Sequence, residues 1–109
     1  MAQRSMYQNH AAEGMKSLGG VYMYLSKSGL PKALLDLVYL RASQINGCAY
    51  CIAMHTRDLL KDGVPVEKLM LASAWSETGA LFSERERSAL AWAEAITLIS
   101  QTHAPDADY

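Results

Sequence analysis

Residues 31–63 read PKALLDLVYLRASQINGCAYCIAMHTRDLLKDG. Positions 33–40 are almost entirely apolar, a pattern typical of a helix that neighbouring elements bury on more than one face. Pro31 suits the first turn of this helix, and Asn46-Gly47 ends it because both residues tolerate a left-handed backbone. The stretch therefore predicts a buried helix over residues 31–45.

The other helices follow from the helical spacing of apolar residues and from the breaking residues between them. Gly19-Gly20 weakens the first helix in its middle. Ser83 and Glu86 form a capping-box pattern at the start of the last one. No strand alternation or internal repeat is apparent. The sequence predicts an all-α fold of about five helices, over residues 11–26, 31–45, 48–61, 65–75 and 83–101, with a loop at 76–79.

Length and composition favour one small domain. The chain has 109 residues, of which 50% are hydrophobic, so we expect a single domain over residues 1–109. The ends, residues 1–10 and 103–109, are expected to be flexible. The apolar stretches at 33–40 and 89–99 are hard to cover within a chain of this size, which predicts a homo-oligomer.

Charge and the N-terminal sequence restrict the partners and the compartment. The formal net charge is -1, with 10 basic and 11 acidic residues and no Lys/Arg cluster. This argues against nucleic acid or an anionic membrane as a partner. The first ten residues lack the apolar stretch of a signal peptide, and no apolar run approaches the length of a membrane span. We expect a cytoplasmic protein, in which two cysteines are more often catalytic or metal-binding than structural.

The strongest chemical pattern is Cys48-Ala49-Tyr50-Cys51 followed by His55. On a helix, Cys48, Cys51 and His55 lie on one stripe because they are spaced three and four residues apart. A helix N-terminus favours the thiolate of Cys48. His55 lies one turn beyond Cys51 and can accept or return its proton. The pattern predicts a pair that cycles between dithiol and disulfide.

Two other interpretations of the cysteines stay open. Buried cysteines often pack as small apolar side chains without any reactivity. Structural zinc needs four ligands, usually including a second Cys/His pair. The remaining histidines, His10 and His103, and the scattered acids are not at ligand spacing. We therefore expect no bound metal.

Asp36 is the only charged residue within positions 33–40. A carboxylate in such a run has either lost much of its solvent and needs a partner, or lies on the polar edge of the helix. The residues alone do not decide between these. Further along the chain, a solvated helix face is expected for Arg57, Asp58, Lys61 and Asp62.

The spacing of these residues resembles a known family. Eleven residues separate the carboxylate residue Asp36 from Cys48. The two cysteines lie in the segment LRASQINGCAYC at 40–51. The sequence SERERSALAW at 83–92, followed by Glu94-Ala95, adds to the similarity. Together these segments resemble the AhpD-like branch of the carboxymuconolactone decarboxylase family. The resemblance spans residues 15–103.

The resemblance implies an all-helical AhpD-like fold that assembles as trimers or hexamers. It also implies peroxidase activity on hydroperoxides, with electrons from an external dithiol, either a protein or a small molecule, and no bound cofactor. In the family, the cysteine at position 51 attacks the peroxide, and the cysteine at position 48 then forms a disulfide with the oxidised sulfur. His55 and Asp36 would form the proton relay. The helix-end argument instead favours Cys48 as the thiolate; we assign the attack to Cys51 because His55 is its one-turn neighbour.

The sequence departs from the family pattern in two respects. The relay carboxylate is Asp36 rather than glutamate, so it is one methylene shorter, and a bridging water would restore the reach. The chain also ends where family members usually continue into further helices. We expect either that these C-terminal helices are missing from the chain or that a partner chain covers the surface they would occupy.

Three functions are compatible with the sequence. The leading prediction is an antioxidant thiol peroxidase, with Tyr50 as a wall of the substrate pocket. A thiol–disulfide oxidoreductase without direct peroxide activity would need the same cysteine pair. A non-catalytic oligomeric module would have cysteines of ordinary reactivity. Decarboxylase activity is not expected, because the decarboxylase branch of the family is not marked by the cysteine pair.

Overall fold

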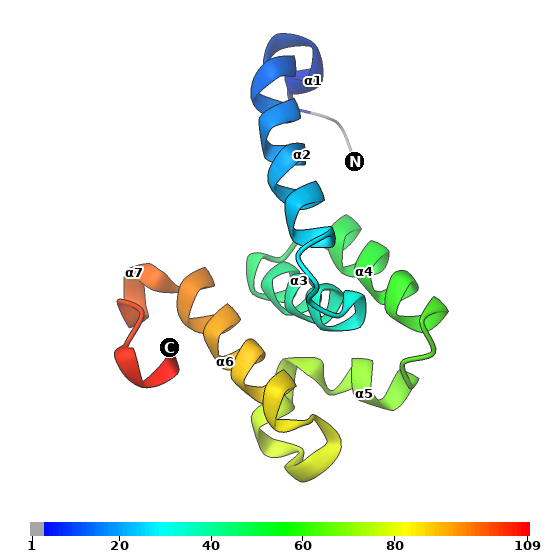
Figure 1. The fold of residues 1–109 in the computed structure, drawn as a ribbon, viewed down its shortest axis with the longest axis vertical. Coiled ribbons are helices and arrows are strands. Elements are labelled where there is room, and N and C mark those ends of the chain that lie inside the picture. Colours follow the sequence, from blue (N-terminus) through cyan, green and yellow to red (C-terminus); the bar gives the residue numbers. More distant parts are fainter. Residues whose placement is uncertain (1–3) are drawn as a thin grey trace. The chain divides into compact units, whose positions relative to one another are not determined.

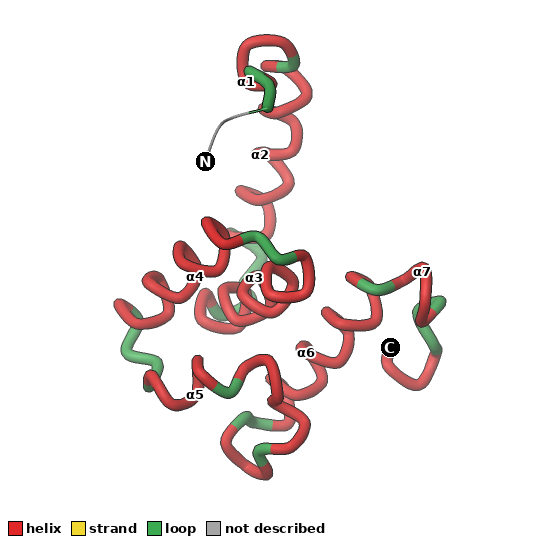
Figure 2. Tube along the Cα trace, turned by 180° about the vertical axis from the view of Figure 1, so that it is seen from behind, coloured by secondary structure: helices red, strands yellow, loops and turns green. Residues whose placement is uncertain are grey.

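The computed structural model describes residues 4–109, and every regular element in that range is a helix (Figure 2). The predicted all-α class is therefore confirmed. Contacts divide the chain into two compact units, Met1–Leu30 and Pro31–Tyr109. That residues 1–109 act as a single domain stays a prediction. Within residues 4–109, no helix has both the length and the apolar content to span a membrane.

The first unit consists of the short helix α1 (Tyr7–His10) and the longer helix α2 (Ala12–Ser26). The prediction of a helix over residues 11–26 is correct to within one residue, and Gly19-Gly20 does not interrupt it. Apolar side chains of α2 remain exposed, among them Leu18, Val21 and Tyr22. Part of the predicted flexible N-terminus, residues 1–3, lies outside the described residues.

The second unit is built around α3 (Lys32–Asn46), which lies between α4 (Ala49–Lys61) and α6 (Glu84–Thr97) (Figure 1). Packing on two sides explains the nearly continuous apolar run at 33–40. A fully buried leucine contributes roughly 1.5–3 kcal/mol relative to an exposed one. The core cluster of this unit consists of Leu37, Leu40, Leu59, Leu69, Ala72, Phe82 and Leu90.

A tight connection joins α3 to α4 and sets the position of the cysteines. Gly47 has a left-handed backbone with φ of 69°, as its sequence predicted. Its amide donates to the carbonyl of Gln44, and the amide of Cys48 donates to Ser43. The chain therefore turns at once, and α4 starts with Cys48 as its N-cap. Gly63, with φ of 85°, follows the other end of the helix.

The prediction of one helix over residues 65–75 is wrong. The chain forms α5 (Val66–Met70), then a 3₁₀ segment η1 (Ala72–Glu77) with a kink at Ala74. This change buries Ala72. It also lets the Trp75 indole donate a hydrogen bond of 2.7 Å to Glu94. Tertiary contacts of this kind override local helix propensity. The predicted loop at 76–79 is also partly helical, within η1 and a second 3₁₀ turn, η2 (Gly79–Leu81).

The capping box of α6 is present as predicted. The Ser83 hydroxyl accepts from the Glu86 amide at 3.2 Å, and the Glu86 carboxylate accepts from the Ser83 amide at 2.9 Å. The helix is shorter than the predicted span to residue 101, because it ends at Thr97 and a separate turn, α7 (Ile99–Thr102), follows. The Thr102 hydroxyl donates to the Ala95 carbonyl at 2.6 Å. This bond holds the turn back against α6.

The C-terminal residues are described by the structure. They contain a 3₁₀ turn, η3 (Asp106–Asp108), and the Tyr109 ring meets the Trp92 ring edge-on at 5.4 Å between centroids. Whether residues 103–109 are flexible in solution stays a prediction.

Candidate redox site

The two cysteines occupy the first turn of α4 and are joined by a disulfide. Cys48 is the N-cap, and its sulfur accepts a hydrogen bond from the Cys51 amide at 3.3 Å. The two Cα atoms are 5.3 Å apart, a separation in the ordinary range for a disulfide. Both residues are half-buried. When the pair is reduced, the unpaired amides of the helix end lie next to the sulfur of Cys48 and favour its thiolate.

His55 lies one turn beyond Cys51 on the same helix and is half-buried. Its Nδ1 atom is buried and has no hydrogen-bond partner within residues 4–109. The imidazole ring also contacts the Tyr39 ring of α3, with 5.3 Å between centroids and an interplanar angle of 39°. Buried polar atoms in proteins are nearly always hydrogen-bonded. The nitrogen therefore needs a hydrogen-bond partner from its surroundings.

Asp36 is buried in α3, with 5% of its surface exposed. The structure thus decides between the two interpretations of this residue in favour of a desolvated carboxylate with a partner. The partner is Lys32, whose ammonium donates to Asp36 Oδ2 at 2.7 Å and to Asp62 Oδ2 at 3.0 Å. The hydrogen bonds to Asp36 and Asp62 raise the pKa of Lys32 well above its usual value. The ammonium therefore stays charged and neutralises the buried acid.

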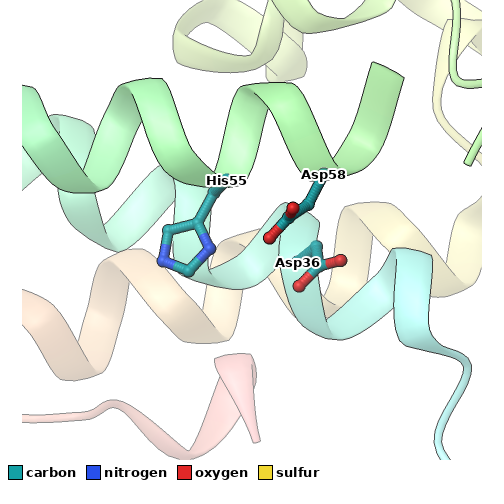
Figure 3. A group of neighbouring side chains, drawn as sticks. All are labelled: Asp36, His55 and Asp58. Atoms are coloured by element: carbon teal, nitrogen blue, oxygen red, sulfur yellow. The ribbon is translucent and has the colours of Figure 1, made fainter. Parts of the chain in front are cut away.

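Three side chains meet where α3 and α4 pack together, as Figure 3 shows. Asp36 comes from α3, whereas His55 and Asp58 come from α4, and all three point toward one another. One imidazole nitrogen and one oxygen of each carboxylate lie within 4.8 Å of one another. The structure thus brings the predicted residues Asp36 and His55 together, and the combination can hold and pass a proton.

Asp58 is the residue that the sequence interpretation missed. It was assigned to a solvated helix face, but it is half-buried and faces the imidazole. The available signal was its position three residues after His55, which puts both on one side of a helix. That signal is weak without knowledge of which side of α4 faces α3.

The same three side chains are the only group of metal-binding type that lies this close together within residues 4–109. The 4.8 Å limit that encloses their ligand atoms is looser than a bound metal requires, since its ligand bonds are about 2.0–2.2 Å long. An added cation would also have to compete with the Lys32 ammonium, which already bonds Asp36. The arrangement suits proton exchange better than metal binding, and we assign no metal to it.

Tyr50 lies between the cysteines on the solvent side of α4, with 72% of its surface exposed. It is not part of the cluster around His55. Its role as a wall of a substrate pocket stays a prediction.

Comparisons with known proteins identify the family. The sequence profile of the carboxymuconolactone decarboxylase family matches residues 10–95. The chain belongs to this family, in the AhpD-like branch that its cysteine motif predicted.

Two relatives support this assignment. The uncharacterized protein YdfG of Bacillus subtilis (strain 168) is 38% identical over 109 residues, which make up 100% of this chain and 74% of YdfG. The crystal structure of ATU0492 from Agrobacterium tumefaciens, a protein of unknown function and a candidate antioxidant defence protein AhpD, superposes with a TM-score of 0.89 at 36% identity. That superposition covers 98% of this chain and 73% of ATU0492.

Proposed function

We propose that this protein is an antioxidant thiol peroxidase, which reduces hydroperoxides through Cys48 and Cys51 with His55 and Asp36 as the proton relay. The observation that carries the proposal is the disulfide across the first turn of α4, one helical turn from a histidine. Membership of the family and the similarity to a candidate antioxidant defence protein support it.

The first chemical step is the attack of the Cys51 thiolate on the terminal oxygen of the hydroperoxide. A sulfur–oxygen bond forms and the O–O bond breaks, so the sulfur is oxidised to a sulfenic acid and the peroxide is reduced. The departing alkoxide takes a proton from the imidazolium of His55 and leaves as an alcohol. The ring holds that proton because it accepted it from the Cys51 thiol when the thiolate formed, and Asp36 is the far end of the relay.

The second step closes the disulfide. The Cys48 thiolate attacks the sulfenic sulfur of Cys51, a sulfur–sulfur bond forms, and the hydroxyl group leaves as water after taking up a proton. An external dithiol then reduces the pair by thiol–disulfide exchange and is itself oxidised to a disulfide. The donor is a dithiol protein or a small dithiol, and the cycle needs no bound cofactor.

The proposal is tested by peroxide consumption with a panel of dithiol donors. We expect turnover of an organic hydroperoxide that depends on both the protein and the donor. Cys51→Ser should reduce consumption to the uncatalysed rate, because the attacking sulfur is gone. Ser88→Ala, which removes an exposed hydroxyl on α6, serves as the control and should retain activity.

Two results would contradict the proposal. Unchanged turnover by Cys51→Ser would rule out attack by this thiol. Wild-type protein that reduces a protein disulfide at high rate but leaves hydroperoxide untouched would indicate a thiol–disulfide oxidoreductase instead.

We also propose that the protein acts as a homo-oligomer, a trimer or hexamer. The exposed apolar side chains of α2 support this, because Leu18, Val21 and Tyr22 each have more than half of their surface exposed. Light scattering at micromolar concentration should give a mass of at least three chains. A monomer under these conditions would contradict the prediction.

A further inference from the structure

His55 has an unmet requirement that the relay through Asp36 does not supply. Its Nδ1 atom is buried without a hydrogen-bond partner in the described chain. A neutral imidazole has one donor and one acceptor nitrogen, and the partner of one nitrogen decides which tautomer forms. For the ring to act as a base toward the cysteines through Nε2, an acceptor must hold the Nδ1 proton.

Asp36 is the weaker of the two candidate acceptors, because Lys32 offsets its charge, although its second oxygen can still accept. Its Oδ2 is already bonded to the Lys32 ammonium at 2.7 Å, and Lys32 is held from the other side by Asp62. Its side chain is also one methylene shorter than the glutamate that the family resemblance implies at this position. Asp36 and Lys32 thus form a nearly neutral pair beside the ring.

Asp58 is free to accept the proton. It lies one turn beyond His55 on α4, points toward the imidazole (Figure 3), and contributes an oxygen to the group within 4.8 Å. Within residues 4–109, its carboxylate makes no hydrogen bond or ion pair. A charge-assisted hydrogen bond would need one of these oxygens at roughly 2.8 Å from Nδ1, so a change of the Asp58 rotamer is part of the inference.

We propose that Asp58 is a positioning residue, which accepts the Nδ1 proton of His55 and fixes the tautomer whose Nε2 is the base. The effect of Asp58 on catalysis rests on the proposed function. Its effect on the His55 tautomer does not. The other groups facing the ring are Asp36 and Tyr39, both from α3. The charge of Asp36 is largely offset by Lys32, whereas Asp58 sets the orientation of the ring.

The test is nitrogen NMR of the labelled imidazole, in the full chain at a pH where the ring is neutral. We expect the Nδ1–H tautomer to dominate in the wild type. Asp58→Ala should lower the ratio of Nδ1–H to Nε2–H by about 10- to 100-fold, the factor that corresponds to one charge-assisted hydrogen bond. Asp58→Asn keeps the shape and a weaker acceptor, and should lie between the two.

Asp62→Ala is the matched control, because it removes a carboxylate at the C-cap of α4 that contacts Lys32 and does not belong to the group around the ring. It should change the tautomer ratio by less than about twofold. An unchanged ratio in Asp58→Ala would overturn the inference, as would a collapse of the ratio in Asp36→Ala alone.

The peroxide assay separates the inference from the proposed function. If the protein does reduce hydroperoxide, kcat/KM of Asp58→Ala should fall by about tenfold or more, with partial rescue in Asp58→Asn. A wild-type protein without peroxide turnover would overturn the proposed function, while the tautomer ratio would still test Asp58.

Discussion

The first turn of α4 and the next two turns of the same helix differ in how they are assembled. The first turn holds Cys48 and Cys51, which are close because they are three residues apart on a helix. The following turns hold His55 and Asp58, which meet Asp36 only because α4 packs against α3. The electron-carrying part of the site is therefore local in sequence, and the proton-carrying part depends on tertiary packing. The two parts should respond differently to substitution.

The largest expected effect is on the cysteine pair itself and follows from the loss of the resolving cysteine, Cys48. Reduced Cys48→Ser, without an added donor, should consume about one equivalent of hydroperoxide and stop at a sulfenic acid on Cys51. A dimedone adduct in the mass spectrum would measure this acid. Wild-type protein should instead form the disulfide and give no adduct.

The same measurement settles which thiol attacks. A sulfenic acid on Cys48 in the Cys51→Ser variant, with none on Cys51 in Cys48→Ser, would reverse the assigned roles. It would then be the helix end, rather than the neighbouring histidine, that selects the reactive sulfur.

Substitution of His55 should impair the proton-carrying part of the site, which depends on tertiary packing. It should leave the cysteine pair, which is local in sequence, intact. His55→Gln should lower kcat/KM for hydroperoxide by about 10²- to 10⁴-fold, the usual contribution of a general acid or base. The disulfide should still form on oxidation by a small disulfide, since the cysteines are held by their own turn. An equal loss in both assays would mean that the two parts are not separable.

Weakening the packing between α3 and α4 should lower the free energy of unfolding of the protein, an effect that we expect to be smaller than the loss of activity in His55→Gln. Leu59 of α4 has 1% of its surface exposed and lies in the core. Leu59→Ala should reduce the free energy of unfolding by about 2–5 kcal/mol, as for other buried leucines. The neighbouring Leu60, with 42% exposed, is the matched control. Denaturant unfolding of Leu60→Ala should show a change well below that of Leu59→Ala.

The smallest expected effect concerns the capping box of α6, which is local in sequence like the cysteine turn but carries no chemistry. Burial raises the pKa of Glu86, but the hydrogen bonds from Lys68 and Ser83 outweigh it and lower the pKa below its usual value. A lowered pKa means that the carboxylate stabilises the fold above its unfolded-state pKa. This contribution disappears as pH falls through the folded-state value.

Glu86→Gln keeps the cap and removes the charge. It should cost about 0.5 kcal/mol at pH 7, since the ion pair with Lys68 is only partly buried. The difference from wild type should begin to shrink as pH falls below the unfolded-state pKa of about 4.3 and should vanish only below the lowered folded-state pKa. Thermal unfolding along a series of pH values measures it. A difference that stays constant over this range would show that the charge contributes nothing.

Much of the fold follows from local patterns. Pro31, the left-handed Gly47 and the Ser83–Glu86 cap mark helix ends that the structure confirms. The failures occurred where tertiary contacts decide the backbone. The chain after Met70 winds into 3₁₀ turns as Ala72 is buried and Trp75 bonds Glu94 from α6. Glu94 lies outside residues 65–75, and the burial of Ala72 cannot be seen from that stretch alone.

The sequence by itself determined the helical class, the family and the adjacency of Cys48 and Cys51, because each depends on spacing along one helix or on a continuous motif. Only the tertiary structure decided that Asp36 is buried beside Lys32 and that Asp58 faces His55. The reason is physical. A carboxylate on a helix has either solvent or a neighbour around it, and which one it meets depends on how α3 and α4 pack, not on the residues next to it in the chain.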